Sequence, residues 1–235
     1  MGVHDGHRER LRQRFLRHGL DSFDDHNVLE LLLFYCLPRR DTNELAHHLL
    51  ERFGSLAGVF DARYEELLKT EGIGENAALL LTLIPQIDRR YHISKEKGAR
   101  IQTSEDAGRY LVERYRYTRE EVVYLLCLDS KNRLIHCREV GRGSLNEANV
   151  SIRTIVETAL GQNAAAVIIS HNHVDGFALP SREDEITTAR IQEALLPIGI
   201  KLVDHIIVCG DDFVSFADSG LLRGVGFHAS GRNSE

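Results

Sequence analysis

The spacing of apolar residues along the chain changes near residue 100. Before this point, apolar residues recur every three or four positions, as at Leu45, Leu49 and Leu50, which is typical of amphipathic helices. After it, short apolar runs such as Val122–Leu128 alternate with helical patterns, which is typical of a sheet with flanking helices. The sequence therefore predicts an all-α N-terminal module followed by a mixed α/β domain, and an α+β chain overall.

The first half is predicted to hold several short helices. They are expected over residues 1–20, 27–37 and 64–69, and after a cap at Asp41 or Thr42. The first of them carries five arginines, and such a run usually forms a solvated face.

A glycine-containing turn at Gly72-Ile-Gly74 precedes a leucine-rich helix. Such a turn between two helices leaves backbone N–H groups free at the start of the second helix, where they can bind phosphate without reading sequence. In this respect the segment resembles a helix-hairpin-helix DNA-binding module, in which Gly72 and Gly74 would make the contact. The alternatives are a tight packing turn or a protein-binding module. Residues 1–100 hold 15 Lys and Arg against 16 Asp and Glu, so this half has no excess of positive charge that would attract DNA.

In the second half, predicted strands and helices alternate, and a polar, unperiodic stretch separates the two halves. Helices are expected over 104–115, 151–161 and 184–196, strands over 122–128, 133–140, 164–169 and 214–216, and a β-pair between 200–203 and 205–209. The predicted domain limits are a helical domain at 1–92, a linker at 93–103, the α/β domain at 104–225 and a flexible tail at 226–235.

The segment Ser170–Asp184 carries the pattern His-x-His-x7-Ser-x2-Asp at the end of a predicted buried strand. Two histidines separated by one residue on an extended chain point to the same side, so His171 and His173 can reach one ion. Ser181 and Asp184 follow after a seven-residue loop. Two imidazoles and a carboxylate bind Zn²⁺ well and leave a fourth position for water, which is the pattern of catalytic zinc sites.

Each part of this pattern has a plainer interpretation. An isolated His-x-His is usually ordinary loop chemistry, and Ser181-x-x-Asp184 matches a capping box at a helix start. The two interpretations of the serine and aspartate are compatible, because a capped helix start is a rigid place to mount a ligand. The combination of both parts across one short loop favours a metal. His205 lies in a predicted strand and is expected to be a core histidine rather than a fourth ligand.

Composition sets wider limits on the class of protein. The net charge of −6 argues against a protein that coats nucleic acid. Four cysteines lie far apart with no Cys-x-x-Cys pair, which predicts reduced thiols rather than a disulfide framework or a zinc ribbon. The chain has no signal peptide and no run of 18 apolar residues, so we expect a cytoplasmic protein with no membrane partner.

Residues 101–220 resemble the JAB/MPN fold in its metal-binding JAMM form, a cytidine-deaminase-like architecture, and in particular the bacterial RadC (UPF0758-like) group. The similarity lies in the metal motif and in the segments Leu128–Arg133, Gly143–Asn146 and Asp204–Ile207. The helical region resembles the helix-hairpin-helix module that usually precedes this domain. Together these similarities cover nearly the whole chain.

The resemblance implies a zinc metalloprotease site. His171, His173 and Asp184 would bind Zn²⁺, and Ser181 would lie beside the metal-bound water. Zinc would make that water nucleophilic at neutral pH, and the Ser181 hydroxyl could donate to the developing oxyanion.

The family also implies a glutamate as general base at the start of strand 122–128, which makes Glu121 the candidate and Glu120 the adjacent alternative. One departure concerns the loop after the second histidine, where the family has proline, serine and glycine and this chain has Val174-Asp-Gly-Phe177. This difference affects the loop and the substrate groove, and Asp175 adds a carboxylate near the metal ligands.

The sequence therefore predicts a zinc-dependent hydrolase that cleaves a peptide or isopeptide bond, with a DNA-associated role in repair or recombination suggested by the family alone. The alternatives are a metal-dependent nuclease and a non-catalytic DNA- or protein-binding scaffold. The expected partners are a peptide or protein substrate and, through the helical module, non-specific DNA.

Overall fold

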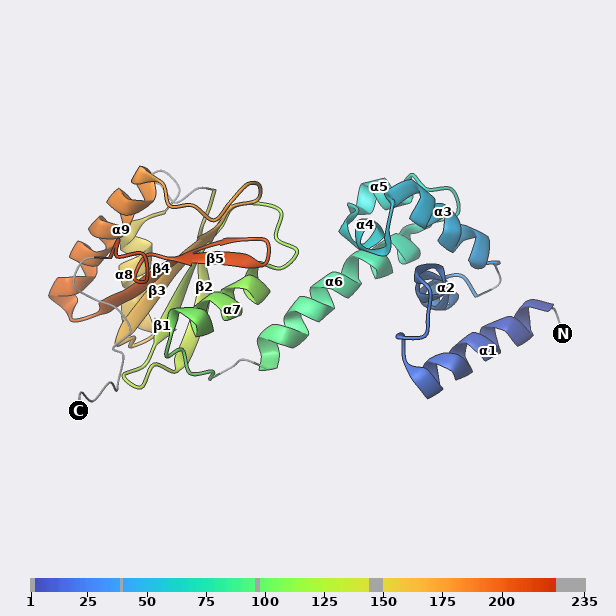
Figure 1. Ribbon diagram of the computed structural model, residues 1–235, viewed down its shortest axis with the longest axis horizontal. Coiled ribbons are helices and arrows are strands. Elements are labelled where there is room, and N and C mark those ends of the chain that lie inside the picture. Colours follow the sequence, from blue (N-terminus) through green and yellow to red (C-terminus); the bar gives the residue numbers. More distant parts are fainter. Residues whose placement is uncertain (1–2, 39, 96–97, 144–149, 223–235) are drawn as a thin grey trace, which may run out of the picture. The chain divides into compact units, whose positions relative to one another are not determined.

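The protein is described by a computed structural model that covers residues 3–38, 40–95, 98–143 and 150–222. The chain divides into two compact units, Met1–Asp88 and Arg89–Glu235, and the boundary falls within one long helix. The first unit is helical and the second holds a five-stranded sheet with flanking helices (Figure 1). The predicted α+β class is confirmed, while the predicted tail at 226–235 lies outside the described residues.

The helical unit is built around a core of leucines and small residues. The predicted stripe is present, because Leu45 and Leu49 are buried against Leu29 and Leu33 of the preceding helix and Leu81 of the last one. The helices are α1 (Val3–His18), α2 (Asp25–Cys36), α3 (Asn43–Phe53), α4 (Leu56–Asp61), α5 (Tyr64–Leu68) and α6 (Glu75–Lys95).

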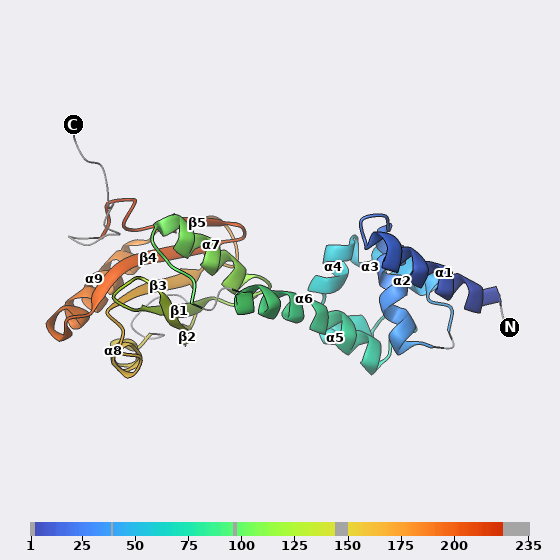
Figure 2. The same cartoon turned by 90° about the horizontal axis from the view of Figure 1, so that it is seen from below.

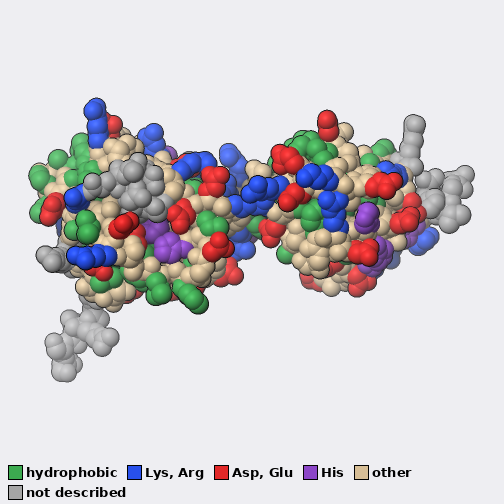
Figure 3. Space-filling model, turned by 90° about the horizontal axis from the view of Figure 1, so that it is seen from above, with side chains coloured by type: hydrophobic (Ala, Val, Ile, Leu, Met, Phe, Trp, Pro, Cys, Tyr) green, Lys and Arg blue, Asp and Glu red, His purple; other side chains and the backbone are tan. Residues whose placement is uncertain are grey.

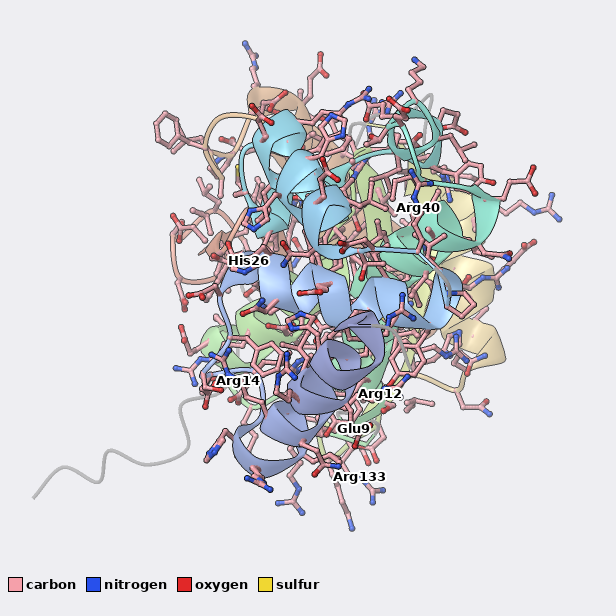
Figure 4. The ribbon with its side chains drawn as sticks, turned by 90° about the vertical axis from the view of Figure 1, so that its right-hand side faces the viewer. Glu9, Arg12, Arg14, His26, Arg40 and Arg133 are labelled. Carbon is pink, nitrogen blue, oxygen red and sulfur yellow. The ribbon has the colours of Figure 1, made fainter. Side chains whose placement is uncertain are left out.

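The arginines of α1 divide into two groups. Arg8 donates hydrogen bonds to the backbone carbonyls of Leu37, Pro38 and Arg40, at 2.8, 2.6 and 2.5 Å, and so satisfies acceptors just beyond the end of α2. Arg14, labelled in Figure 4, donates to Asn27 of α2 at 3.4 Å. These two arginines attach α1 to its neighbour, whereas the others on this helix are exposed, as the sequence predicts: Arg10, Arg12 and Arg17.

The sheet unit has the strand order β2-β1-β3-β4-β5, in which only β3 and β4 run parallel. Helix α7 covers one face, and α8 and α9 cover the other (Figures 1 and 2). Successive residues alternate between the two faces except at bulges, one of which lies in β4 between Leu202 and Asp204. The elements are α7 (Ser104–Tyr115), β1 (Val122–Leu128), β2 (Leu134–Arg142), α8 (Ile152–Gly161), β3 (Ala166–Asn172), α9 (Arg182–Leu195), the short 3₁₀-helix η1 (Leu196–Ile198), β4 (Lys201–Cys209) and β5 (Asp212–Ser215).

The predicted β-pair between 200–203 and 205–209 is wrong, because both segments belong to the single strand β4. The polar residue between them, Asp204, is buried rather than placed in a turn. Its carboxylate accepts hydrogen bonds from the Ser215 hydroxyl at 2.6 Å and from the backbone N–H groups of Ala217 and His205 at 3.0 and 2.8 Å. These hydrogen bonds satisfy the buried carboxylate, so the strand continues through Asp204. From the sequence alone, this polar residue had indicated a break between two strands.

The predicted linker at 93–103 is partly wrong as well. Helix α6 continues to Lys95, and residues beyond it bond to the β1–β2 hairpin. Leu134 N donates to Ala99 O at 2.9 Å, and Ile101 N donates to Asn132 O at 2.8 Å. Ile101 is also buried in the core beneath α7, so the end of this stretch belongs to the sheet unit.

Gly108 of α7 allows that helix to lie close to β5, because a methyl group at this position would overlap the ring of Phe213. In a free helix, Ala is preferred over Gly by about 1 kcal/mol. Here we expect Gly108→Ala to destabilise the sheet unit by about 1–3 kcal/mol, since overpacking outweighs that preference. Gly161→Ala at the end of α8, where a methyl group meets nothing within 4 Å, is the control. Chemical denaturation compares the two, and a stable Gly108→Ala protein would contradict the packing argument.

Candidate metal centre

The strand β3 and the helix α9 bring the predicted ligands together. β3 runs to Asn172, so His171 is part of the strand and His173 follows it directly. His171 lies on the α8–α9 face, because it shares the alternation of Val167 and Ile169. A loop then leads to α9, whose first turn carries Asp184. His171 and Asp184 are buried, and His173 is half-buried.

The ligand atoms of these three residues converge. His171 Nε2 lies 3.2 Å from His173 Nε2 and 3.4 Å from Asp184 Oδ1. A zinc ion with tetrahedral ligands at 2.0–2.1 Å separates neighbouring ligand atoms by about 3.3 Å. Within the described part of the chain, these three residues form the group of His, Cys, Asp or Glu side chains whose ligand atoms lie close enough together to hold a metal ion. The donor set and its spacing therefore fit a metal ion.

The hydrogen bond of His173 fixes which of its nitrogens faces the other ligands. Its Nδ1 lies 2.9 Å from the carbonyl oxygen of Phe177. A carbonyl oxygen can only accept, so Nδ1 of His173 carries the proton and Nε2 of the neutral ring holds a lone pair. That lone pair points toward His171 Nε2 and Asp184 Oδ1, as a metal ligand requires.

His171 makes its other contact inside the protein. Burial lowers the pKa of His171 to about 4, so this imidazole is neutral at pH 7. Its Nδ1 lies 3.0 Å from Nε2 of His205, a fully buried residue whose ring stacks on Phe216 with centroids 4.3 Å apart. His205 thus bonds to His171 on the side away from the ligand atoms, which agrees with its expected place in the core.

Ser181 and Asp184 form the predicted capping box at the start of α9. Ser181 N and Ser181 Oγ donate to Asp184 Oδ2 at 2.8 and 2.6 Å, and Asp184 N donates to Ser181 Oγ at 3.1 Å. Because Oδ2 is held in this way, Oδ1 is turned toward His171. The Ser181 hydroxyl thus donates its proton to Asp184 Oδ2, so the serine fixes the direction of the carboxylate.

Glu121 immediately precedes β1, and the strand register indicates where it lies. Val123 of β1 is paired with His171 of β3 in antiparallel register. Continued by two residues, the same register sets Glu121 opposite His173. Residues directly opposite each other share a face of the sheet. Glu121 and His173 lie just outside the paired segments of β1 and β3, and Glu121 is half-buried.

Asn172, between the two histidines, holds the start of β1 beside the end of β3. Its side-chain oxygen accepts from Val122 N at 2.8 Å, and its amide nitrogen donates to Glu120 O at 3.1 Å. The side chain of Glu120 is exposed and forms an ion pair with Arg142 at 3.1 Å. Sequence reasoning did not single out Asn172, whose partners lie about fifty positions earlier in the chain.

The loop between His173 and Ser181 places apolar side chains in solvent beside the ligands. Val174, Phe177 and Leu179 are exposed, with Phe177 77% accessible, and Asp175 is exposed too. Figure 3 shows histidine side chains at the surface of the sheet unit with acidic side chains nearby. The atypical loop thus exposes several apolar side chains in the segment that joins the predicted ligands.

Gly72 and Gly74 lie in the helical unit, in the turn before α6. Gly72 has a positive φ of 90°, and a side chain there would meet the Arg40 guanidinium at 2.7 Å. Arg40 donates to Gly72 O at 3.4 Å. Gly72 is thus required by the shape of the turn, which is the packing interpretation of the motif, and Arg40 adds a positive charge beside it.

Two family models match the chain. The RadC-like JAB domain matches residues 101–221, and the UPF0758 N-terminal domain matches residues 6–79. The chain belongs to the RadC-like UPF0758 family. UPF0758 proteins of Fusobacterium nucleatum and Bordetella petrii are 34% and 39% identical to it over 225 and 217 residues, which are 92% and 91% of this chain and 97% and 96% of theirs.

Two further findings concern the cysteines and the helices. The four cysteines are free thiols, as their spacing predicts. No helix in the described part of the chain is long and apolar enough to span a membrane.

Metal analysis tests the ligand set. We expect purified protein to carry a single zinc ion and the His171→Ala, His173→Ala variant to carry only background metal, because two of three ligands are gone. The control is His136→Ala, an exposed histidine on β2. Equal zinc content in the double variant and in the control would contradict the assignment.

Proposed function

We propose that this protein is a zinc-dependent hydrolase that cleaves a peptide or isopeptide bond. The observation that supports it most is the convergence of three potential ligands: His171 Nε2 lies 3.2 Å from His173 Nε2 and 3.4 Å from Asp184 Oδ1, and the ligand atoms of the three residues lie within 4.8 Å of one another. Three protein ligands are the usual complement of a catalytic zinc site. A cavity of about 230 Å³ borders His173 and is lined by Tyr115, Arg116, Asn172 and Asp211, while His171 and Asp184 lie outside its lining.

His171, His173 and Asp184 would hold the zinc ion. When bound, zinc supplies a Lewis acid that lowers the pKa of a coordinated water from about 15.7 to about 7. The protein contributes the fixed positions of its three ligands, two of which are buried and therefore poorly reached by competing solvent.

Glu121 is the proposed general base. Its carboxylate would take a proton from the attacking water and later deliver that proton to the leaving amine. Asn172 supports this role, because its two hydrogen bonds hold the chain on either side of Glu121 at the end of β3.

Ser181 has two proposed tasks. It orients the Asp184 carboxylate, and its hydroxyl could turn to donate to the oxyanion that develops on the scissile carbonyl.

The exposed side chains of Val174, Phe177 and Leu179 favour a peptide substrate, because they offer apolar contacts along the loop next to the ligands. Charge disfavours the nuclease alternative. The helical unit, residues 1–88, holds 10 Lys and Arg against 15 Asp and Glu, so a polyanion would meet net repulsion there. Any contact of this unit with DNA would be confined to phosphates at the Gly72–Gly74 turn beside Arg40.

Mutation of the two adjacent glutamates tests the general base. We expect Glu121→Gln to keep bound zinc but to lower peptide hydrolysis by about 10²–10⁴-fold, since it removes the proton acceptor while preserving shape. Glu120→Gln should hydrolyse at nearly the wild-type rate, because the Glu120 carboxylate is exposed and paired with Arg142. Metal analysis and cleavage of a peptide library measure both effects, with plasmid DNA as the alternative substrate.

Three results would contradict parts of this proposal. Loss of activity in Glu120→Gln alone would place the register one residue away from the one proposed. Full activity of both variants would move the base elsewhere, with Asp175 the next candidate. Zinc-dependent cleavage of plasmid without peptide cleavage would favour the nuclease.

A further inference from the structure

A buried row of hydrogen bonds runs from His171 to helix α9, which carries the predicted ligand Asp184. Nδ1 of His171 lies 3.0 Å from Nε2 of His205, and Nδ1 of His205 lies 2.7 Å from the Thr188 hydroxyl. The Thr188 hydroxyl lies 2.6 Å from the backbone carbonyl oxygen of Asp184. His171, His205, Thr188 and Asp184 are all buried, so water does not compete for these bonds.

The chemistry of each atom fixes the direction of the row. A carbonyl oxygen only accepts, so the single hydroxyl proton of Thr188 goes to Asp184 O. The hydroxyl must then accept from Nδ1–H of His205. A neutral His205 therefore has its lone pair on Nε2, where it can accept only if His171 donates from Nδ1. This leaves Nε2 of His171 without a proton, facing His173 Nε2 and Asp184 Oδ1.

We propose that Thr188 and His205 are positioning residues that hold His171 in the tautomer whose Nε2 can bind zinc. This inference rests on the proposed zinc site and adds two residues that do not touch the metal. Metal-binding histidines generally donate their second N–H to an acceptor that fixes the ring and its tautomer. Here that acceptor is a second neutral imidazole, whose own tautomer is set by a threonine hydroxyl.

The row of hydrogen bonds also links the His171 ring to the backbone of helix α9. It begins at the backbone of Asp184 and ends at the ring that faces the side chain of the same residue. Loss of the Thr188 hydroxyl would allow His205 to carry its proton on Nε2 instead. His171 would then have to accept at Nδ1 and carry its proton on Nε2, which blocks the lone pair that zinc needs.

A role in packing alone is the competing explanation. His205 stacks on Phe216, and Thr188 is buried on α9, so bulky changes at either position could disturb the fold. Packing requires the shape of Thr188 but not its hydroxyl. Thr188→Val keeps the shape and removes the hydroxyl, so it separates the two explanations.

The experiment measures zinc affinity and the tautomer of His171 together. Zinc affinity is obtained by competition with a chelator for the full chain, and the tautomer by NMR of protein with ¹⁵N-labelled histidine. We expect Thr188→Val to weaken zinc binding by about 10–100-fold, the usual effect of losing a bond behind a ligand. In the metal-free variant, the His171 signals should shift away from the Nδ1–H tautomer.

Matched variants complete the test. Thr188→Ser keeps a hydroxyl and should restore wild-type affinity, and Thr187→Val removes a hydroxyl from the adjacent buried position and should bind zinc as the wild type does. His205→Phe keeps a ring against Phe216 but cannot accept from His171, so it should weaken zinc binding as Thr188→Val does. Unfolding curves establish that each variant is folded.

The outcomes distinguish this inference from the proposed function. Wild-type protein that binds no zinc at His171 and His173 would contradict the proposed function itself. Wild-type protein that binds zinc, with Thr188→Val equal to it in affinity and in the His171 tautomer, would contradict only the positioning role.

Discussion

The candidate metal centre depends on three potential ligand atoms that the fold brings close together in a largely buried site. Two imidazole nitrogens stand 3.2 Å apart, and a carboxylate oxygen lies 3.4 Å from one of them. In the proposed tautomers, hydrogen bonds on the far side of each ring turn lone pairs, not protons, toward the shared point. Lone pairs at this distance repel one another, and burial strengthens that repulsion because the local dielectric is low. A metal ion at the shared point converts the repulsion into attraction.

The fold explains how this arrangement can be held. The parallel pair of β3 and β4 places His171 and His205 side by side on one face of the sheet, where α9 covers them. The capping box at the start of α9 directs one oxygen of Asp184 toward the histidines. Asn172 holds the start of β1 against the end of β3 at the same end of the sheet. Strand pairing, helix capping and ligand orientation therefore converge on one end of the sheet.

Local features of the sequence predicted much of this. The spacing of His171, His173, Ser181 and Asp184 is short-range, and both the strand periodicity and the capping signal act within a few residues, so the candidate ligand group could be picked out from the sequence alone. The continuity of β4 could not, since Asp204 is satisfied by Ser215 and Ala217 from a later segment. The contacts of Thr188 and His205 were hidden for the same reason, because they depend on which strands and helices become neighbours.

The most direct test of the account is a crystal structure of the zinc-loaded protein with anomalous diffraction measured at the zinc edge. We expect a single strong zinc peak bound by Nε2 of His171, Nε2 of His173 and a carboxylate oxygen of Asp184, with Nδ1 of His171 still bonded to His205. A zinc ion bound through Nδ1 of His171, or located away from these three residues, would contradict it.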